Sequence, residues 1–353
     1  MTTDKNILIH NIYYMLAYAF RYFRLNLLEE MQGEKFEDIQ DLFAEILIRC
    51  VSDQIKQGMY RTYVSKEGTL PVIRGKIDFL KTQKVQQSKP LYACCQYDEL
   101  SFNNPYNQVV KTTLQCLLYC SNVSVNRKHS IRHILRYFIS IDSMSLSSVQ
   151  WNKFVFDGNN QSYQFLINIC RFLHEEKIMT TEKGVYKLKS LSDNQMARLF
   201  EKFVLEYYKR HHPETKPRAA KIEWDIIKEE STVSILPIML TDIMLNIGER
   251  TLIIDTKYIE ESMKSYFNKS EIDIGHLRQI HFYVSEYDKE KLGKVNGVLL
   301  YAKTQEIITP YGQMKLPTGS TIYFRTLDLN QDFEEIANQL DQLINLGGTI
   351  LEE

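Results

Sequence analysis

Apolar residues recur at helical spacing in several segments of the chain. The clearest stripe runs from Met196 to Tyr207, with apolar side chains at i, i+3, i+4, i+7, i+8 and i+11. That period is typical of a helix that buries one face against a core. The same reasoning predicts helices over residues 11–20 and 35–58, and three or four more between 107 and 173. A short strand at residues 6–9 and an Asn11 cap precede the first helix.

Strand signals are concentrated in two places. Between Met59 and Phe102, β-branched and aromatic runs alternate with glycines and prolines, which predicts a small strand-rich insertion with turns. The second place is residues 236–258, where two apolar runs flank Gly248-Glu249. A two-residue loop that begins with Gly favours a type II′ hairpin, so Ile247 should pair with Arg250.

The length of 353 residues favours two domains. Residues 1–190 contain 24 Lys and Arg against 18 Asp and Glu, whereas residues 191–353 contain 19 against 26. A capping-box pattern from Ser192 to Gln195 opens a new helix at the same place. We therefore expect an N-terminal domain over 1–190 and a second domain over 191–353.

The composition excludes several classes of protein. No apolar run approaches the roughly 18 residues that cross a bilayer, and no secretory leader pattern is present, so we expect a cytoplasmic protein with no membrane contact. The six cysteines form no CxxC pair and lie among apolar neighbours, as reduced core thiols do. No GxxxxGK[ST] loop occurs, so a partner must supply any nucleotide hydrolysis.

The hairpin at residues 236–258 carries the candidate chemistry. Counting outward from its turn places Asp242 opposite Asp255, and Lys257 shares their face because side chains alternate along a strand. Bare carboxylates in that position repel each other, and burying them is costly. Mg²⁺ resolves the conflict, and the lysine then orients water or offsets phosphate charge, as in phosphodiester hydrolysis. The alternative is a surface Asp-Lys pair on an exposed sheet edge.

Further candidates lie on the helices around this hairpin. Glu201 and Glu206 flank the apolar stripe on opposite sides, and we favour Glu201 as the third metal ligand, although both can be ordinary surface glutamates. Gln279 and Tyr283 share one face of a helix predicted over 273–285 and can brace the lysine or the DNA.

The N-terminal half contains one strongly basic segment, at residues 127–136. Such a run is most often a solvated helix face, and contact with phosphates is the alternative. The acidic second half fits a domain that a partner delivers to DNA, because it lacks an attractive field of its own.

The hairpin residues resemble the PD-(D/E)xK nuclease superfamily. Asp242 and Asp255-Thr256-Lys257 match its metal and lysine positions, and Glu201 is similar to the acidic residue of its first helix. Gln279 and Tyr283 resemble a motif of RecB-like members. The proline that usually precedes the first aspartate is displaced, to Pro237.

Over nearly its whole length the chain resembles the McrC family, in segments 11–18, 73–79 and 98–107. The resemblance implies an α+β N-terminal partner-binding region with a strand-rich insertion, followed by an α/β PD-(D/E)xK restriction-endonuclease-like domain. It also implies a partner, a hexameric McrB-type AAA+ GTPase that recognises modified cytosine and uses the GTP. The McrC-type chain then cuts double-stranded modified DNA and stimulates the GTPase.

The basic insertion at residues 59–102 suits entry into such a ring, and we expect Arg74 and Lys76 to bind the partner. A solvated basic loop is the alternative. Two other functions stay open at this point. One is a stand-alone RecB-like repair or RNA-processing nuclease, and the other is a non-catalytic activator of an AAA+ GTPase.

Overall fold

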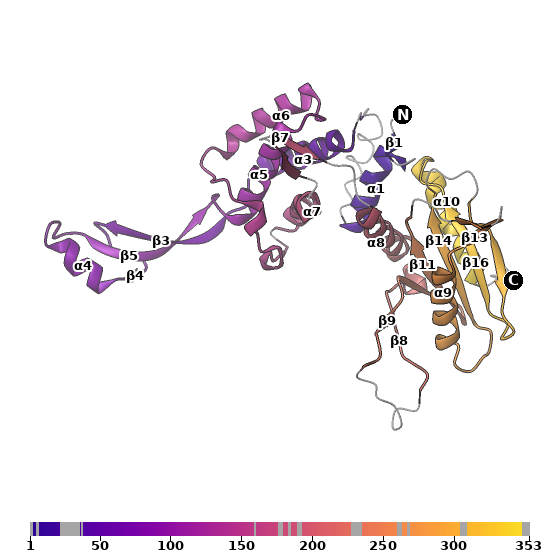
Figure 1. Ribbon diagram of the computed structural model, residues 1–353. Coiled ribbons are helices and arrows are strands. Elements are labelled where there is room, and N and C mark those ends of the chain that lie inside the picture. The colour runs from indigo at the N-terminus through magenta and orange to yellow at the C-terminus, as the bar shows by residue number, and fades with distance from the viewer. Residues whose placement is uncertain are drawn as a thin grey trace. The chain divides into compact units, whose positions relative to one another are not determined.

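A computed structural model shows two compact units, which are described separately. Unit 1 comprises Met1–Leu42 and Ser190–Glu353, and unit 2 comprises Phe43–Lys189 (Figure 1). The structure describes residues 3–4, 7–21, 36, 38–158, 160–175, 179–182, 185–188, 193–226, 235–259, 263–266, 269–303 and 309–347. Ser192, the expected helix cap, lies outside these ranges.

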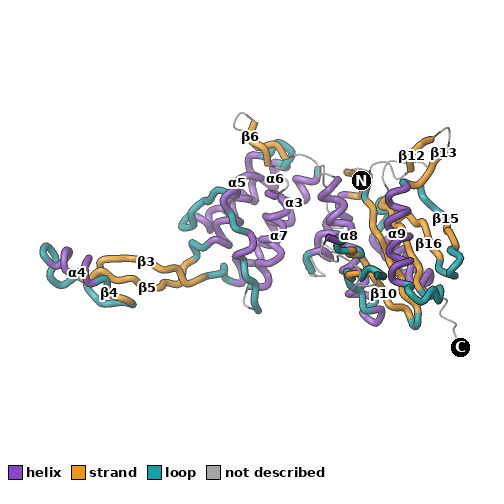
Figure 2. Tube along the Cα trace, turned by 60° about the horizontal axis from the view of Figure 1, so that its bottom comes forward, coloured by secondary structure: helices purple, strands orange, loops and turns teal. Residues whose placement is uncertain are grey.

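Unit 1 is built on a five-stranded sheet of order β10-β11-β14-β16-β15 (Figure 2). Its strands are β10 (Ile243–Ile247), β11 (Arg250–Lys257), β14 (Val295–Ala302), β15 (Gly312–Lys315) and β16 (Thr321–Leu327). The three central strands are parallel, and the edge strands β10 and β15 are antiparallel. Every residue of β14 is buried, as expected for a parallel strand covered on both faces.

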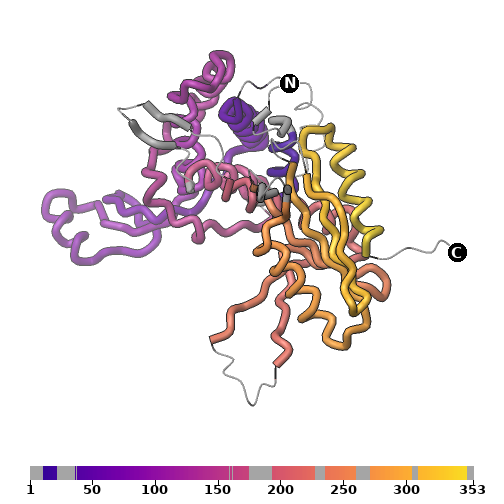
Figure 3. The backbone as a smooth tube through the Cα atoms, turned by 45° about the vertical axis from the view of Figure 1, so that its right-hand side comes forward, coloured from indigo at the N-terminus to yellow at the C-terminus, as the bar shows by residue number. Residues whose placement is uncertain are grey.

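Three helices of unit 1 pack along this sheet. They are α8 (Asp193–His211), which contacts β11, α9 (Ile274–Tyr287), which contacts β11 and β14, and α10 (Phe333–Ile344), which contacts β16. Figure 3 shows α10, in yellow, running beside the strands. Smaller elements complete the unit: β1 (Thr3–Asp4), β2 (Ile7–Leu8), β8 (Lys221–Ile222), β9 (Met239–Leu240), β12 (Met263–Tyr266) and β13 (Lys269–Ile272).

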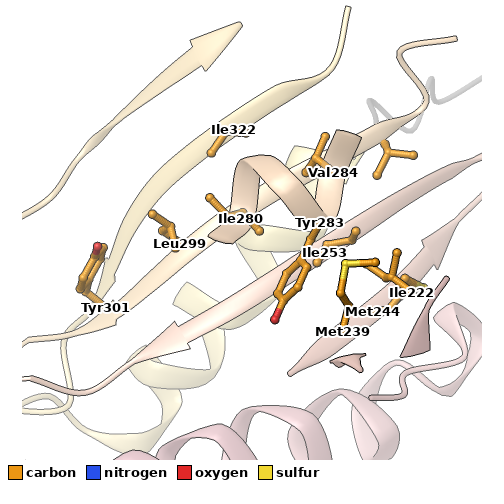
Figure 4. Packing of buried hydrophobic residues seen from close by; sticks show 11 residues of the cluster. Ile222, Met239, Met244, Ile253, Ile280, Tyr283, Val284, Leu299, Tyr301 and Ile322 are labelled. Carbon is orange, nitrogen blue, oxygen red and sulfur yellow. The ribbon is translucent and has the colours of Figure 1, made fainter. Parts of the chain in front are cut away.

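The buried face between α9 and the sheet is apolar (Figure 4). Ile280 and Val284 of α9 pack in one cluster with Ile253 and Leu299 of the sheet. A Cβ at Gly297 would lie 2.8 Å from the Val284 side chain and 2.9 Å from that of Ile280. The glycine therefore permits the close approach of α9 to β14.

The first helix, α1 (Ile9–Ala19), belongs to unit 1 and not to the N-terminal domain expected over 1–190. Its aromatic face explains the difference: the Tyr14 ring stacks on Phe333 of α10 at 4.3 Å, and Tyr18 meets Phe203 of α8 edge-on at 5.6 Å. Asn11 lies within α1 and does not cap it. Its amide donates hydrogen bonds to two carbonyls of the segment before α10.

Unit 2 combines helices with a three-stranded insertion. The helices are α3 (Ile39–Gln57), whose first residues belong to unit 1, α5 (Pro105–Tyr119), α6 (Val125–Leu135) and α7 (Gln161–Glu175), with the hairpin β6 (Met179–Glu182) and β7 (Val185–Leu188). The insertion contains β3 (Thr62–Leu70), β4 (Lys76–Ile77) and β5 (Ala93–Ser101), in the order β3-β5-β4. It also contains a helix that the sequence analysis missed, α4 (Phe79–Gln86), which Asp78 caps.

Two other expectations can be compared with the structure. Within the described ranges, no helix is long and apolar enough to pass through a bilayer. Five of the six cysteines are buried, and no disulfide joins described residues.

Candidate active site

The β10–β11 hairpin has the predicted register. Ile247 pairs with Arg250 across the Gly248-Glu249 turn, and Gly248 has φ +58°, the left-handed value that the first central residue of a type II′ turn needs. The last pair of the ladder is Ile243 with Ile254. Asp242 therefore lies immediately before β10, one step beyond the paired residues, and Asp255 is the next residue of β11.

Thr256 holds the Asp242 carboxylate in place. The Oδ2 atom of Asp242 accepts a hydrogen bond from the Thr256 backbone N–H at 2.7 Å and another from its hydroxyl at 2.8 Å. The motif alone assigned no role to Thr256. The available signal was a hydroxyl residue between two charged residues, in a strand otherwise rich in Leu and Ile.

Asp255 is fully buried, and the Lys257 ammonium group forms an ion pair with it. Within the described part of the chain, neither carboxylate oxygen accepts a directional hydrogen bond, although Lys257 Nζ lies 2.7 Å from Oδ2 as an ion pair. Burial raises the pKa of Asp255 to about 6, with Lys257 lowering it and Asp242 raising it. A ligand that supplies positive charge here would relieve a real electrostatic cost.

Lys257 is the first member of a chain of hydrogen bonds that ends on the protein backbone. Its Nζ donates to Gln279 Oε1 at 3.1 Å, and Gln279 Nε2 donates to the Tyr283 hydroxyl at 3.0 Å. Tyr283 in turn donates to the Leu240 carbonyl at 3.0 Å. The chain links α9 to the segment that carries Asp242, so it fixes the ammonium group relative to both strands of the hairpin.

The two candidate glutamates of α8 have different surroundings. Burial raises the pKa of Glu201, and the negative charges of Asp242 and Asp255 raise it further, so Glu201 lies within electrostatic reach of both aspartates. Glu206 instead binds Arg21 at 2.7 Å and Lys209 at 2.8 Å. Although burial opposes them, these hydrogen bonds hold the pKa of Glu206 below its ordinary value.

The donor set suits a hard cation that keeps part of its water shell. Among the described residues, no three His, Cys, Asp or Glu side chains are grouped closely enough to enclose an ion by themselves. Mg²⁺ does not require such a cage, because it usually binds through one or two carboxylates plus water and substrate phosphate. The buried Asp255 oxygens without hydrogen bonds are the observation that fits such an ion.

Arg74 and Lys76 are found in the insertion of unit 2. The Arg74 guanidinium lies 4.7 Å from the centre of the Tyr97 ring, and Lys76 faces Gln96 across the β4–β5 pair. Both side chains are exposed, so they are available for contact with another molecule.

Comparison with known proteins gives similarities of three kinds. A family profile described as McrBC 5-methylcytosine restriction system component matches residues 2–302. A protein of Escherichia coli (strain K12), described as the type IV methyl-directed restriction enzyme EcoKMcrBC, is 23% identical over 335 residues, which are 94% of this chain and 95% of that protein. The half-complex from the tetradecameric assembly of Thermococcus gammatolerans McrB AAA+ hexamers with bound McrC shares the fold, with a TM-score of 0.60 and 15% identity over 96% of this chain and 76% of that one.

Proposed function

The chain belongs to the McrBC 5-methylcytosine restriction system component family, and from this premise we propose that it is the DNA-cleaving subunit of a modification-dependent restriction endonuclease. The observation that carries the proposal is the cluster of Asp242, Asp255 and Lys257 at the open end of the β10–β11 hairpin, in which the Asp255 carboxylate is buried and paired with Lys257. A charged group in this setting destabilises the fold, so a function explains its presence better than stability does.

The arrangement suits the PD-(D/E)xK type of active site. In this proposal Asp242 and Asp255 hold Mg²⁺, and Glu201 completes the site through the face of α8 nearest to them. The ion would polarise the scissile phosphate and lower the pKa of a bound water. Lys257, held by Gln279, orients the attacking water and balances charge on the phosphate.

Tyr283 and Gln279 act as positioning residues in this scheme. Their hydrogen bonds hold the Lys257 ammonium on the side of Asp255, and a lysine without that support would sample several rotamers. Thr256 has the same role for Asp242, because two donors from one residue restrict the carboxylate to one orientation.

The partner in this proposal is a hexameric AAA+ GTPase of the McrB type, with modified double-stranded DNA as the substrate. The structural relative is described as McrC bound to McrB AAA+ hexamers, and this chain has no phosphate-binding loop in its sequence. GTP would therefore be used by the partner. We assign Arg74 and Lys76 of the insertion to partner contact, because both are exposed cations beside the β4–β5 pair.

The test is reconstitution with an AAA+ GTPase of the McrB type. We expect cleavage of modified DNA only with Mg²⁺, the partner and GTP present together, and loss of cleavage in Lys257→Ala with GTPase stimulation retained. Lys294→Ala is the matched control, because this half-exposed lysine pairs with Glu249 at the far end of the same hairpin.

Other results of this reconstitution would indicate a different function. Cleavage by the chain alone would indicate a stand-alone nuclease. GTPase stimulation without any cleavage by the wild-type protein would indicate a non-catalytic activator. Charge reversal at Arg74 and Lys76 should lower stimulation, and unchanged stimulation would exclude these two side chains from the partner contact.

A further inference from the structure

One face of α6 in unit 2 carries two exposed arginines that form no ion pair with the residues the structure describes. Ile131 and Ile134 are buried and anchor the helix on α5. The opposite side presents exposed residues at helical spacing, and we call them the α6 basic face: His129, Arg132, His133, Arg136 and Tyr137. The last two belong to the short helix η1 (Arg136–Phe138), which follows α6 directly in the chain.

The sequence around α6 contains no acidic residue over a long stretch. Residues 100–141 include no Asp or Glu, and the next acid, Asp142, accepts a hydrogen bond from Asn103 at 2.6 Å. Arg127 differs from the face residues, because it is 12% exposed and forms an ion pair with Glu45 at 2.9 Å. Neither Arg132 nor Arg136 has an ion pair with any described residue. Their charges are therefore available to an anionic ligand.

The geometry of the face suits the DNA backbone. Residues 129 and 136 are separated by seven helical steps, or about 11 Å, which corresponds to roughly three phosphates of one strand along a duplex. The residue types also fit, since an Arg guanidinium can donate two parallel hydrogen bonds to phosphate oxygens and Tyr adds a hydroxyl donor. The exposed Tyr137 ring lies 5.9 Å from the His133 ring, so the face ends in a pair of aromatic donors.

The charge balance of the chain shows why such a surface is needed. Residues 191–353, which carry the proposed active site, contain 26 acidic against 19 basic residues. Phosphate neutralisation supplies most sequence-independent affinity for DNA. A nuclease with this imbalance needs a source of attraction elsewhere, and the α6 basic face is an uncompensated source within unit 2.

We propose that the α6 basic face binds the phosphate backbone of DNA independently of sequence. This inference rests on the proposed nuclease function and assigns to the chain a DNA contact outside the cleavage site. An acidic surface of the partner is the competing occupant. The experiment below distinguishes the two by measuring DNA affinity and GTPase stimulation separately.

The test uses the full chain without its partner and a fluorescent unmodified duplex, in buffer without Mg²⁺ so that no cleavage occurs. The variant is Arg132→Gln/Arg136→Gln, and the matched control is Lys81→Gln/Lys84→Gln on α4, which removes the same charge from exposed lysines of the same unit. Lys81 already pairs with Glu67 at 2.7 Å, so its loss should matter little for DNA. A double charge-reversal variant, Arg132→Glu/Arg136→Glu, gives a larger change of the same sign.

We expect the Arg132→Gln/Arg136→Gln variant to bind the duplex at least about tenfold more weakly than the wild type, because two phosphate contacts are lost. Each contact contributes about 0.9 to the steepness of log K plotted against log salt, so the slope should become less steep by about 1.8. The control should keep the wild-type slope. Circular dichroism and thermal unfolding should match those of the wild type, because both arginines are exposed.

Three results would overturn the proposal. They are equal weakening in variant and control, no measurable binding by the wild type at about 50 mM salt, and unchanged DNA affinity with reduced GTPase stimulation, which would assign the face to the partner. Each of these leaves the nuclease assignment intact, because that assignment depends on the loss of cleavage in Lys257→Ala.

Discussion

Two lysine-carboxylate pairs in this protein have nearly the same length and very different energetics. In β11, Lys257 Nζ lies 2.7 Å from Asp255, and the two side chains are 16% and 0% exposed. In the insertion, Lys66 Nζ lies 2.6 Å from Glu99, and the side chains are 48% and 41% exposed. Water screens the second pair, whereas the first has lost most of its hydration.

The pKa shifts of the carboxylates record this difference. Burial raises the pKa of Asp255 to about 6 despite the adjacent ammonium group. The hydrogen bond from Lys66 lowers the pKa of Glu99, as is usual for an ion pair in water. Distance alone therefore does not identify a functional pair. Burial with a raised carboxyl pKa marks a candidate for a functional pair, because the fold bears a cost there that a ligand can offset.

Breaking the buried site should produce the largest effect. Asp242→Asn and Asp255→Asn each remove a ligand charge without changing shape, and we expect cleavage to fall at least about 100-fold. The measurement is the rate of DNA cutting by the reconstituted complex, with Glu99→Gln as the control from the exposed pair. A cleavage rate within twofold of wild type in either Asn variant would remove these residues from the site.

A second prediction concerns pH. A carboxylate with a pKa of about 6 is ionised at pH 7 and mostly protonated at pH 5, so cleavage should fall about tenfold over that interval. More Mg²⁺ should move the fall to lower pH, because metal and proton compete for the same oxygens. Rate profiles at two Mg²⁺ concentrations test this prediction. A profile that does not shift with Mg²⁺ would show that another group limits the rate.

The sequence predicted the parts of this site that depend on local periodicity. The Gly248-Glu249 turn determines the register of β10 against β11, and the two-residue strand period places Asp255 and Lys257 on one face. The Thr256 hydroxyl between two charged residues marked the position, but its hydrogen bonds to Asp242 depend on the end of the ladder at Ile243, which periodicity does not give.

Long-range packing explains the remaining differences. Nothing local to residues 9–19 indicates that α1 packs on α8 and α10. Arg21, two residues after the end of α1, binds Glu206 of α8. Helical periodicity alone could not separate Glu201 from Glu206. Their roles as metal ligand and structural residue stay predictions, which the surroundings of each carboxylate now sharpen.

Glu201→Gln should therefore affect cleavage, whereas Glu206→Gln should affect stability. We expect Glu201→Gln to slow cleavage about fivefold and to raise the Mg²⁺ concentration that gives half the maximal rate. One ligand charge is lost in this variant, although water can take the place of the missing oxygen. Glu206→Gln should leave cleavage within about twofold and lower the melting temperature, because Arg21 and Lys209 lose their buried partner. A metal titration of both variants decides, and the reverse ranking would show that Glu206 is the ligand.

The smallest effect is on stability, and it separates the two lysine pairs most directly. The folded-state pKa of Asp255 lies above the ordinary value of 3.8, so the folded protein binds the extra proton. The fold is then most stable, as far as this group is concerned, below about pH 4, and it loses that contribution as pH rises through 6. At pH 8 without metal, Asp255→Asn removes the ionised group. The rise of the pKa from 3.8 to about 6 limits the resulting gain in the free energy of unfolding to about 3 kcal/mol.

The amide that replaces the carboxylate is buried without hydrogen bonds, and this cost offsets part of the gain in the free energy of unfolding. We therefore expect Asp255→Asn to be more stable than the wild type by about 1 kcal/mol. Glu99→Gln should show no measurable change under the same conditions, because its pair is exposed to water. Urea unfolding with a chelator present measures both variants, and added Mg²⁺ should stabilise the wild type but not Asp255→Asn. Destabilisation of Asp255→Asn at pH 8 would mean that its ion pair with Lys257 supports the fold, and that the carboxylate needs no metal to account for its position.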